Sequence, residues 1–145
     1  MEKYTRERLL QEYAEGKRDF SKIDLSGVDL HGVDLRNAKL YYAKLYYAKL
    51  CGTDLRGADL CGANLCSANL RYAIGNMQEI KSMQLDKYMI TYTSEVMAIS
   101  CKQHTIEEWK NFSDDEISQM DESALDWWKK WKQDILSIVD KSFKE

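Results

Sequence analysis

Residues 18–72 decide the fold, and they read RDFSKIDLSGVDLHGVDLRNAKLYYAKLYYAKLCGTDLRGADLCGANLCSANLRY. A leucine stands at every fifth position of this stretch, in phase with Phe20: Leu25, Leu30, Leu35, Leu40, Leu45, Leu50, Leu55, Leu60, Leu65 and Leu70. Neither an α-helix, with about 3.6 residues per turn, nor an alternating strand keeps a five-residue register over such a length. A fixed repeat of this kind is typical of a solenoid, whose units bury their apolar faces by stacking on one another.

The residues around each leucine also repeat. The residue directly before each leucine is polar, and a small or β-branched residue stands one position earlier: Ile23, Val28, Val33, Ala38, Ala43, Ala48, Thr53, Ala58, Ala63 and Ala68. The pattern predicts that the leucine and the small residue point into a shared core, with the polar residue between them facing out.

The units IDLSG, VDLHG, VDLRN, AKLYY, TDLRG, ADLCG and ANLCS resemble the A-(D/N)-L-x-x motif of pentapeptide-repeat proteins. The lead-in over residues 9–27 also resembles the usual entry into that family's repeat domain. The resemblance covers residues 18–72 and implies a right-handed quadrilateral β-helix, with one unit per wall and four units per coil. Residues twenty apart would then stack in neighbouring coils at the usual strand spacing.

Three segments are expected along the chain. Residues 1–17 are predicted to form an N-terminal capping helix, with Thr5 as N-cap and an apolar face of Leu9, Leu10 and Tyr13. The β-helix is expected over residues 18–75, and a hairpin followed by helices over residues 76–145. The fold class is therefore a β-solenoid with a helical cap and a small, mostly helical α+β C-terminal segment.

The C-terminal segment carries several local signals. Alternating residues between positions 80 and 100 favour a hairpin that turns at residues 93–95, and capping residues predict helices that begin after Thr105, Ser113 and Ser123. The last helix is expected to bury one apolar stripe, namely Trp127, Trp131, Ile135 and Ile138. The four tryptophans are interpreted as the core of this segment, and Cys101 as a small buried residue.

The middle coil differs from its neighbours in charge. Lysine replaces the usual Asp or Asn at positions 39, 44 and 49, and the register stacks these lysines on Asp19, Asp24 and Asp29. We expect each charge to find an opposite neighbour across one strand spacing, which stabilises the stack by a few tenths of a kcal/mol per pair, roughly.

The same coil carries four tyrosines at outward positions, beside small residues in the coils above and below. Three interpretations remain open: the C-terminal segment covers the rings, a partner protein binds them, or they form a stacking platform for a nucleotide. The candidate binding residues are Tyr41, Tyr42, Tyr46, Tyr47, Lys44, Lys49 and Arg56.

Composition and motifs argue against catalysis and against nucleic-acid binding. The chain has a net charge of −3 and no basic stripe, and it lacks a phosphate-binding loop and the common hydrolase motifs. Cys101 and His104 are too few to hold zinc, and no third group is evident for a Cys–His nucleophile. We expect no enzyme activity, no metal and no cofactor.

The location of the protein is predicted from what the sequence lacks. The N-terminal sequence has no apolar segment typical of a signal peptide, and no apolar stretch is long enough to span a membrane. The four cysteines are then expected to be reduced, and the protein to be cytoplasmic.

Residues 97–132 also resemble the C-terminal region of small bacteriophage-encoded proteins. Together with the lack of catalytic motifs, this predicts a non-enzymatic protein that binds and inhibits a host protein, such as a defence protein, in the host cytoplasm. One alternative is a sponge that sequesters a nucleotide signal in a cleft between the β-helix and the C-terminal segment. A second is a DNA mimic that protects gyrase, which the net charge of +2 over residues 18–72 disfavours. A homo-oligomer could form through residues 76–145.

Overall fold

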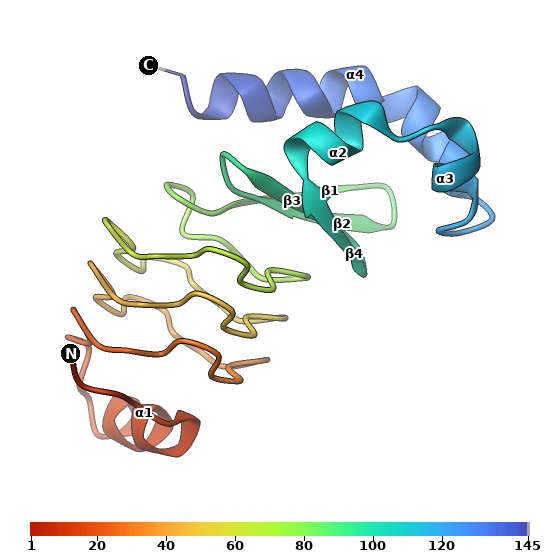
Figure 1. Cartoon of the computed structure of the whole chain (residues 1–145). Helices are drawn as coiled ribbons and strands as arrows, with labels where there is room; N and C mark the ends of the chain where they lie inside the picture. The colour runs from red at the N-terminus through yellow and green to blue at the C-terminus, as the bar shows by residue number, and fades with distance from the viewer. Residues whose placement is uncertain (145) are drawn as a thin grey trace.

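The computed structural model describes residues 1–144 (Figure 1). Stacked coils form the body, a helix lies at the N-terminal end, and a sheet with helices lies at the other end. The elements in chain order are α1 (Arg6–Ala14), β1 (Lys81–Leu85), β2 (Tyr88–Tyr92), β3 (Val96–Ile99), β4 (Lys102–Thr105), α2 (Ile106–Asn111), α3 (Asp114–Ser118) and α4 (Ala124–Ser142).

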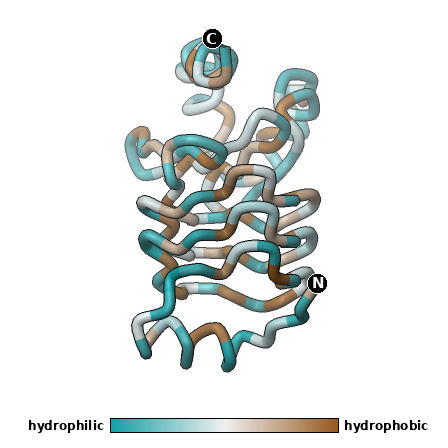
Figure 2. Tube along the Cα trace, turned by 90° about the vertical axis from the view of Figure 1, so that its left-hand side faces the viewer, coloured by the Kyte–Doolittle hydropathy of each residue, from teal (hydrophilic) through white to brown (hydrophobic). Residues whose placement is uncertain are grey.

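The coils repeat every twenty residues. Outward residues twenty apart pair in parallel: Asp19 with Lys39, Asp24 with Lys44, Asp29 with Lys49, Asp34 with Asp54, Lys39 with Asp59, Lys44 with Asn64, Lys49 with Asn69, and Asp54 with Ile74. This pairing confirms the five-residue register and the four units per coil. Figure 2 shows the coils stacked on one another.

Each coil has four walls, which we name after the leucine of the middle coil. The Leu40 wall comprises residues 18–20, 38–40 and 58–60, and the Leu45 wall residues 23–25, 43–45 and 63–65. The Leu50 wall comprises residues 28–30, 48–50 and 68–70, and the Leu55 wall residues 33–35, 53–55 and 73–75.

The inward side chains form a continuous core. Phe20 and nine of the ten ladder leucines are at most 1% exposed. The exception is Leu65, which is half-buried. Burial of each aliphatic side chain contributes about 2 kcal/mol to the free energy of unfolding, so the leucine columns dominate the stability of the coils.

The N-terminal end is covered by α1 and by a short extended segment before it. The Thr5 hydroxyl accepts a hydrogen bond from the Arg8 backbone N–H at 3.1 Å, which starts the helix at Arg6. Leu9 is buried in the same core as the ladder leucines, whereas Leu10, which we assigned to the apolar face, is exposed. Lys3 pairs in parallel with Asp24, so residues 2–4 add a strand to the Leu45 wall. This strand was not predicted, because residues 2–4 carry no repeat unit.

The ladder ends at Gly75, where the chain turns away from the coil. A side chain at this position would collide with the backbone carbonyl of Ile80, so the close approach of these two segments requires glycine. Ile80 is fully buried and joins the leucine core. The C-terminal segment therefore continues the packing of the β-helix.

A four-stranded antiparallel sheet in the order β1-β2-β3-β4 follows. The expected turn at residues 93–95 joins β2 to β3, but the sheet is larger than the predicted hairpin. β4, with the sequence KQHT, was missed because it contains no apolar residue. It is one of the two edge strands of the sheet, where polar residues are tolerated.

The helices after β4 cover the other face of this sheet (Figure 1). Thr105 and Ser113 form capping boxes at α2 and α3, while Ser123 precedes α4 without a capping hydrogen bond. The predicted stripe of α4 is confirmed only at Ile135: the buried residues of the helix are Trp128, Ile135 and Val139. The other members of that stripe are half-buried or, for Ile138, 41% exposed.

Candidate binding surface

Aspartate and asparagine side chains hold the corners of the β-helix. In most units the carboxylate or amide oxygen accepts a hydrogen bond from the backbone N–H two residues later, as in Asp24 to Ser26 at 2.9 Å and Asn64 to Cys66 at 3.0 Å. Such local bonds stabilise a turn. The preference for Asp or Asn before each leucine therefore has a structural cause.

Lysine cannot accept these bonds, so the middle coil gives up this support at three corners. Lys44 stacks on Asp24 as expected, but the ion pair of Asp24 is with Lys3, at 3.6 Å. Hydrogen bonds from Ser26 lower the pKa of Asp24, and the positive charges of Lys3 and Lys44 lower it further. The predicted charge complementarity thus acts through space and without a direct contact.

The four tyrosines lie at the two corners that flank Lys44 on the Leu45 wall. Tyr41 and Tyr42 form an edge-to-face pair with ring centres 6.2 Å apart, and Tyr46 and Tyr47 form a second pair at 6.1 Å. Tyr42 is 57% exposed and Tyr47 is 67% exposed. We call these four residues the tyrosine patch.

The tyrosine patch has a conformational cost. Tyr42 and Tyr47 have φ angles of 58° and 60°, in the left-handed region that glycine occupies at Gly27 and Gly62 in the neighbouring coils. A bulky residue in this conformation costs about 1 kcal/mol. Core packing does not offset this cost, because both rings point outward.

The C-terminal segment does not cover the tyrosine patch. Its contacts with the β-helix fall on the last coil, where Gln103 binds Leu70 and Thr91 binds Ala73. Figure 1 shows the sheet seated on the end of the coils and not along their side. Of the three interpretations of the tyrosines, internal docking is therefore wrong.

The three basic residues among the candidate binding residues lie on different parts of the β-helix. Lys44 lies between the two tyrosine pairs, and Lys49 lies on the adjoining Leu50 wall. Arg56 lies at the corner between the Leu55 and Leu40 walls, so it does not join the tyrosine patch.

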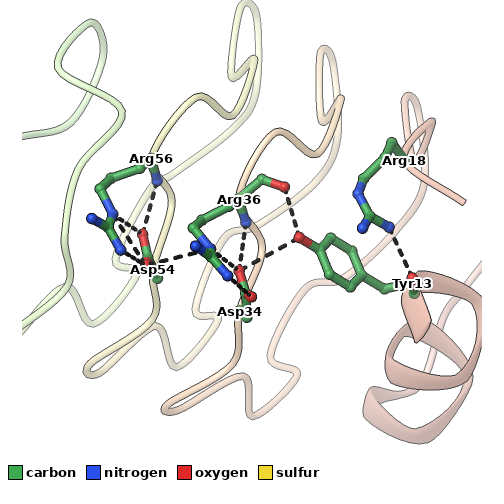
Figure 3. A network of polar contacts seen from close by, with 6 residues as sticks. All are labelled: Tyr13, Arg18, Asp34, Arg36, Asp54 and Arg56. Atoms are coloured by element: carbon green, nitrogen blue, oxygen red, sulfur yellow. Dashed lines mark hydrogen bonds and ion pairs between the residues drawn. The ribbon is translucent and has the colours of Figure 1, made fainter. Parts of the chain in front are cut away.

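Arg56 belongs instead to a polar ladder that Figure 3 shows. It contacts Asp54 at 2.6 Å, Arg36 contacts Asp34 at 2.8 Å, and the Tyr13 hydroxyl donates to the Arg36 carbonyl at 2.7 Å. The hydrogen bond from the Arg36 guanidinium holds the pKa of Asp34 well below its usual range. The guanidinium groups of Arg36 and Arg56 are each engaged by a carboxylate of their own unit, and Arg36 also approaches Asp54 of the next coil at 3.9 Å, so the ladder links adjacent coils.

A groove with a volume of about 810 Å³ separates the last coil of the Leu45 wall from the C-terminal segment. None of the seven candidate binding residues lines it. Its lining is Ala63, Asn64, Leu65, Cys66, Ser67, Gln78, Glu79, Lys81, Thr93, Ser94, Glu95, Val96, Thr105, Ser142, Phe143 and Lys144.

The charged side chains that line the groove differ in whether they already have partners. Lys81 donates to the Ser142 carbonyl at 2.9 Å and lies over the Phe143 ring, and Lys144 pairs with Asp140 at 2.6 Å. Glu79 and Glu95 take part in no ion pair among residues 1–144. Glu79 and Glu95 repel a phosphate, and of the two lysines only Lys81 has no carboxylate partner, so the lining does not favour the nucleotide-sponge interpretation.

The Cys–His pair of the sequence lies apart from these surfaces. Cys101 is exposed, which corrects its assignment as a buried residue: it lies in the turn before β4. His104, in β4, packs edge-on against Trp109 and Phe112. Residues 1–144 contain no group of three or more His, Cys, Asp and Glu side chains placed to hold a metal ion. No helix in this part of the chain is long and apolar enough to cross a membrane.

Comparison with known proteins identifies the repeat. Residues 19–57 and 43–74 match the family model for pentapeptide repeats, with 8 copies. The chain is 35% identical to alr5209, a pentapeptide repeat protein from Nostoc PCC 7120, over 50% of this chain and 75% of that one, with a TM-score of 0.32. The chain belongs to the pentapeptide-repeat family through this part of its sequence.

Two further solved structures are similar over shorter segments. Rfr23 from Cyanothece 51142 is 25% identical over 40% of this chain and 44% of its own, with a TM-score of 0.22. HetL from Nostoc sp. strain PCC 7120, which is involved in heterocyst differentiation regulation, is 29% identical over 40% of each chain, with a TM-score of 0.17. No curated protein matches the chain.

Proposed function

We propose that this protein is a non-enzymatic binding protein that recognises a partner protein through the tyrosine patch and Lys44. The observation that carries the proposal is a cluster of four tyrosine rings that the C-terminal segment leaves uncovered, in which Tyr42 and Tyr47 are exposed and Tyr41 and Tyr46 are half-buried. Tyrosine supplies a large contact area with little loss of side-chain entropy, and it is enriched among the residues that dominate interface energies.

Two features support a functional origin of the patch. Tyr42 and Tyr47 occupy left-handed positions at a cost in stability, and the lysines of the same coil replace the residues that would hold its corners. Together they produce a rigid surface of rings around a cation, which can contact both apolar and acidic groups of a partner. The resemblance of residues 97–132 to bacteriophage-encoded proteins makes a host protein the first partner to test.

The proposal is tested with a variant that restores the usual corner residues. Tyr41→Ser, Tyr42→Gly, Tyr46→Ser and Tyr47→Gly convert both corners to the Ser-Gly sequence found at residues 26–27. Native mass spectrometry of the protein purified from its natural host identifies the bound partner, and titration calorimetry compares the affinities of the two forms. We expect a loss of at least a hundredfold in affinity with an unchanged or higher melting temperature.

Tyr72→Ser is the matched control, because Tyr72 is an exposed tyrosine with a φ of 60° at a different corner. Its hydroxyl lies 2.7 Å from that of Ser100, so the melting temperature of this variant is measured as well. This variant should bind the partner as the wild type does. Full affinity in the fourfold variant, or an equal loss in Tyr72→Ser, would show that the tyrosine patch is not the binding surface.

A further inference from the structure

The last coil of a β-helix exposes one pair of backbone groups on each wall. Within the coils, the leucine N–H and the carbonyl two residues before it pair with the coil above, as in Leu45 N–H to Asn64 at 2.8 Å and Asn64 N–H to Ala43 at 2.9 Å. The last coil has no such neighbour, so these groups need other partners.

On the Leu50 wall, one side chain replaces the missing coil. The Gln103 amide accepts from the Leu70 N–H at 2.7 Å and donates to the Ala68 carbonyl at 2.7 Å. It thereby reproduces the donor and acceptor that a further strand would present.

The C-terminal segment caps two other walls with hydroxyls and an amide. On the Leu55 wall, the Thr91 hydroxyl donates to the Ala73 carbonyl at 2.7 Å, and the Ser82 hydroxyl accepts from the Gly75 N–H at 3.2 Å. On the Leu40 wall, the Asn76 amide donates to the Ala58 carbonyl at 2.9 Å.

The Leu45 wall differs from the other three. Among residues 1–144, neither the Leu65 N–H nor the Ala63 carbonyl has a hydrogen-bond partner, whereas on the Leu40 wall only the Leu60 N–H lacks one. Within the same residues, the Ser67 N–H at the next corner is also unpaired, as are the corner N–H groups of Gly62 and Tyr72. The groove of about 810 Å³ lies directly over these groups, and Leu65 is the ladder leucine that is left half-buried. The wall therefore ends in an open strand edge inside a groove.

The opposite end of the same wall shows how a short segment uses such an edge. Residues 2–4 pair with Asp24 through the Tyr4 N–H at 2.9 Å and the Glu2 carbonyl at 2.8 Å. Lys3 faces outward at the centre of this strand, and Tyr4 is buried against Phe20. A triplet with a basic residue at its centre and an apolar residue beside it thus already extends this wall.

The lining of the groove indicates a similar triplet at the open edge. Ala63, Leu65 and Val96 are partly buried apolar residues that inward-facing apolar side chains would cover. Glu79 and Glu95 favour a basic residue, because Lys144 is paired with Asp140 and the Lys81 ammonium is directed at the Ser142 carbonyl, so neither lysine forms an ion pair with these two carboxylates. The parallel pairing of all coils sets the direction of the added strand.

We propose that the groove binds an extended segment of the partner protein, with an apolar–basic–apolar triplet, as an additional parallel strand on the edge formed by residues 63–67. The central residue of the triplet donates its N–H to the Ala63 carbonyl and accepts from the Leu65 N–H, as in the coils below. The assignment rests on the proposed function, because the tyrosine patch lies one coil away on the same wall and would contact the body of that partner.

The test uses a defined probe, the peptide acetyl-Gly-Ala-Lys-Leu-Ser-Gly-amide, whose central triplet is that of residues 43–45. It is titrated into the ¹⁵N-labelled full-length protein. We expect saturable amide shifts at Leu65 and Ser67 and none at Leu70, whose N–H is already bound by Gln103. The same peptide methylated at the lysine backbone nitrogen lacks the donor for the Ala63 carbonyl and should bind at least tenfold more weakly. The unmethylated peptide should likewise bind the Glu95→Gln variant at least tenfold more weakly than it binds the wild type.

Three outcomes would overturn the inference. They are equal binding of the methylated peptide, shifts that include Leu70 to the same extent, and concentration-dependent shifts at Leu65 without peptide, which would assign the edge to a second copy. Peptide binding is also measured with the fourfold tyrosine variant, which should retain it. If the peptide does not bind while the fourfold tyrosine variant loses the partner, only the inference of an added strand is wrong. If the tyrosine variant keeps the partner, the proposed function is wrong whatever the peptide does.

Discussion

The Gln103 amide bridge allows a quantitative test of how the C-terminal segment closes the β-helix. Gln103→Ala removes the acceptor of the Leu70 N–H and the donor to the Ala68 carbonyl, and both bonds are 2.7 Å long. The substitution removes no residue from the leucine core, because Gln103 lies on β4 outside it. The loss therefore reports on the two hydrogen bonds.

The magnitude follows from the burial of the two partners. Each bond contributes about 1 kcal/mol net, and a buried group left without a partner costs about 1–3 kcal/mol. Leu70 and Ala68 are each 1% exposed, so water has little access to them. We expect the free energy of unfolding to fall by about 2–4 kcal/mol, which for a chain of this size lowers the melting temperature by roughly 5–15 °C.

Urea titration followed by tryptophan fluorescence and circular dichroism measures the change. Gln84→Ala is the control, because Gln84 is an exposed glutamine on β1 whose single contact, with Asp86, is local. It should lower the free energy of unfolding by less than about 0.5 kcal/mol. A loss of the same small size in Gln103→Ala would refute the argument that this amide substitutes for a strand.

Two further predictions concern the coils. Leu45→Asp buries an unpaired charge at a fully buried position and should unfold the protein, whereas Lys44→Asp, stacked on Asp24 without a contact, should cost less than about 1 kcal/mol; similar melting temperatures would reject the register. Because hydrogen bonds from the neighbouring guanidinium groups lower the pKa of Asp34 and Asp54 from the usual 3.8, their contribution is present above that value and lost as the pH falls further below it. The urea concentration at the midpoint of unfolding should therefore decrease as the pH is lowered from about 4. A midpoint concentration that stays constant or increases in this range would contradict the linkage.

The sequence alone determined the β-helix, down to the stacking of individual residues. The position of a residue within its unit determines its orientation, so Leu45 and Ala43 were predicted to point inward. The pairing of Asp24 with Lys44 follows from the twenty-residue coil that the resemblance to pentapeptide-repeat proteins implies. The tyrosine corners were found for the same reason. Only the capping role of Asp and Asn at the corners needed the structure.

Helix caps were also local enough to predict. Thr5, Thr105 and Ser113 accept bonds from residues three positions later, so no distant segment is involved. The buried face of α4 was not predictable in this way. Apolar residues at 127, 128, 131, 135, 138 and 139 surround much of the helix, and the sheet that packs against it selects Trp128, Ile135 and Val139.

What only the tertiary structure decided is where the β-helix remains open. The placement of Gln103, Thr91 and Asn76 over three walls depends on how the sheet sits on the last coil, through contacts between residues 18 to 35 positions apart. A repeat cannot encode this, because its four walls are equivalent until something docks on them. The open edge at Leu65 and the exposure of the tyrosine patch both result from that docking, since it covers the end of the coils and leaves their side free.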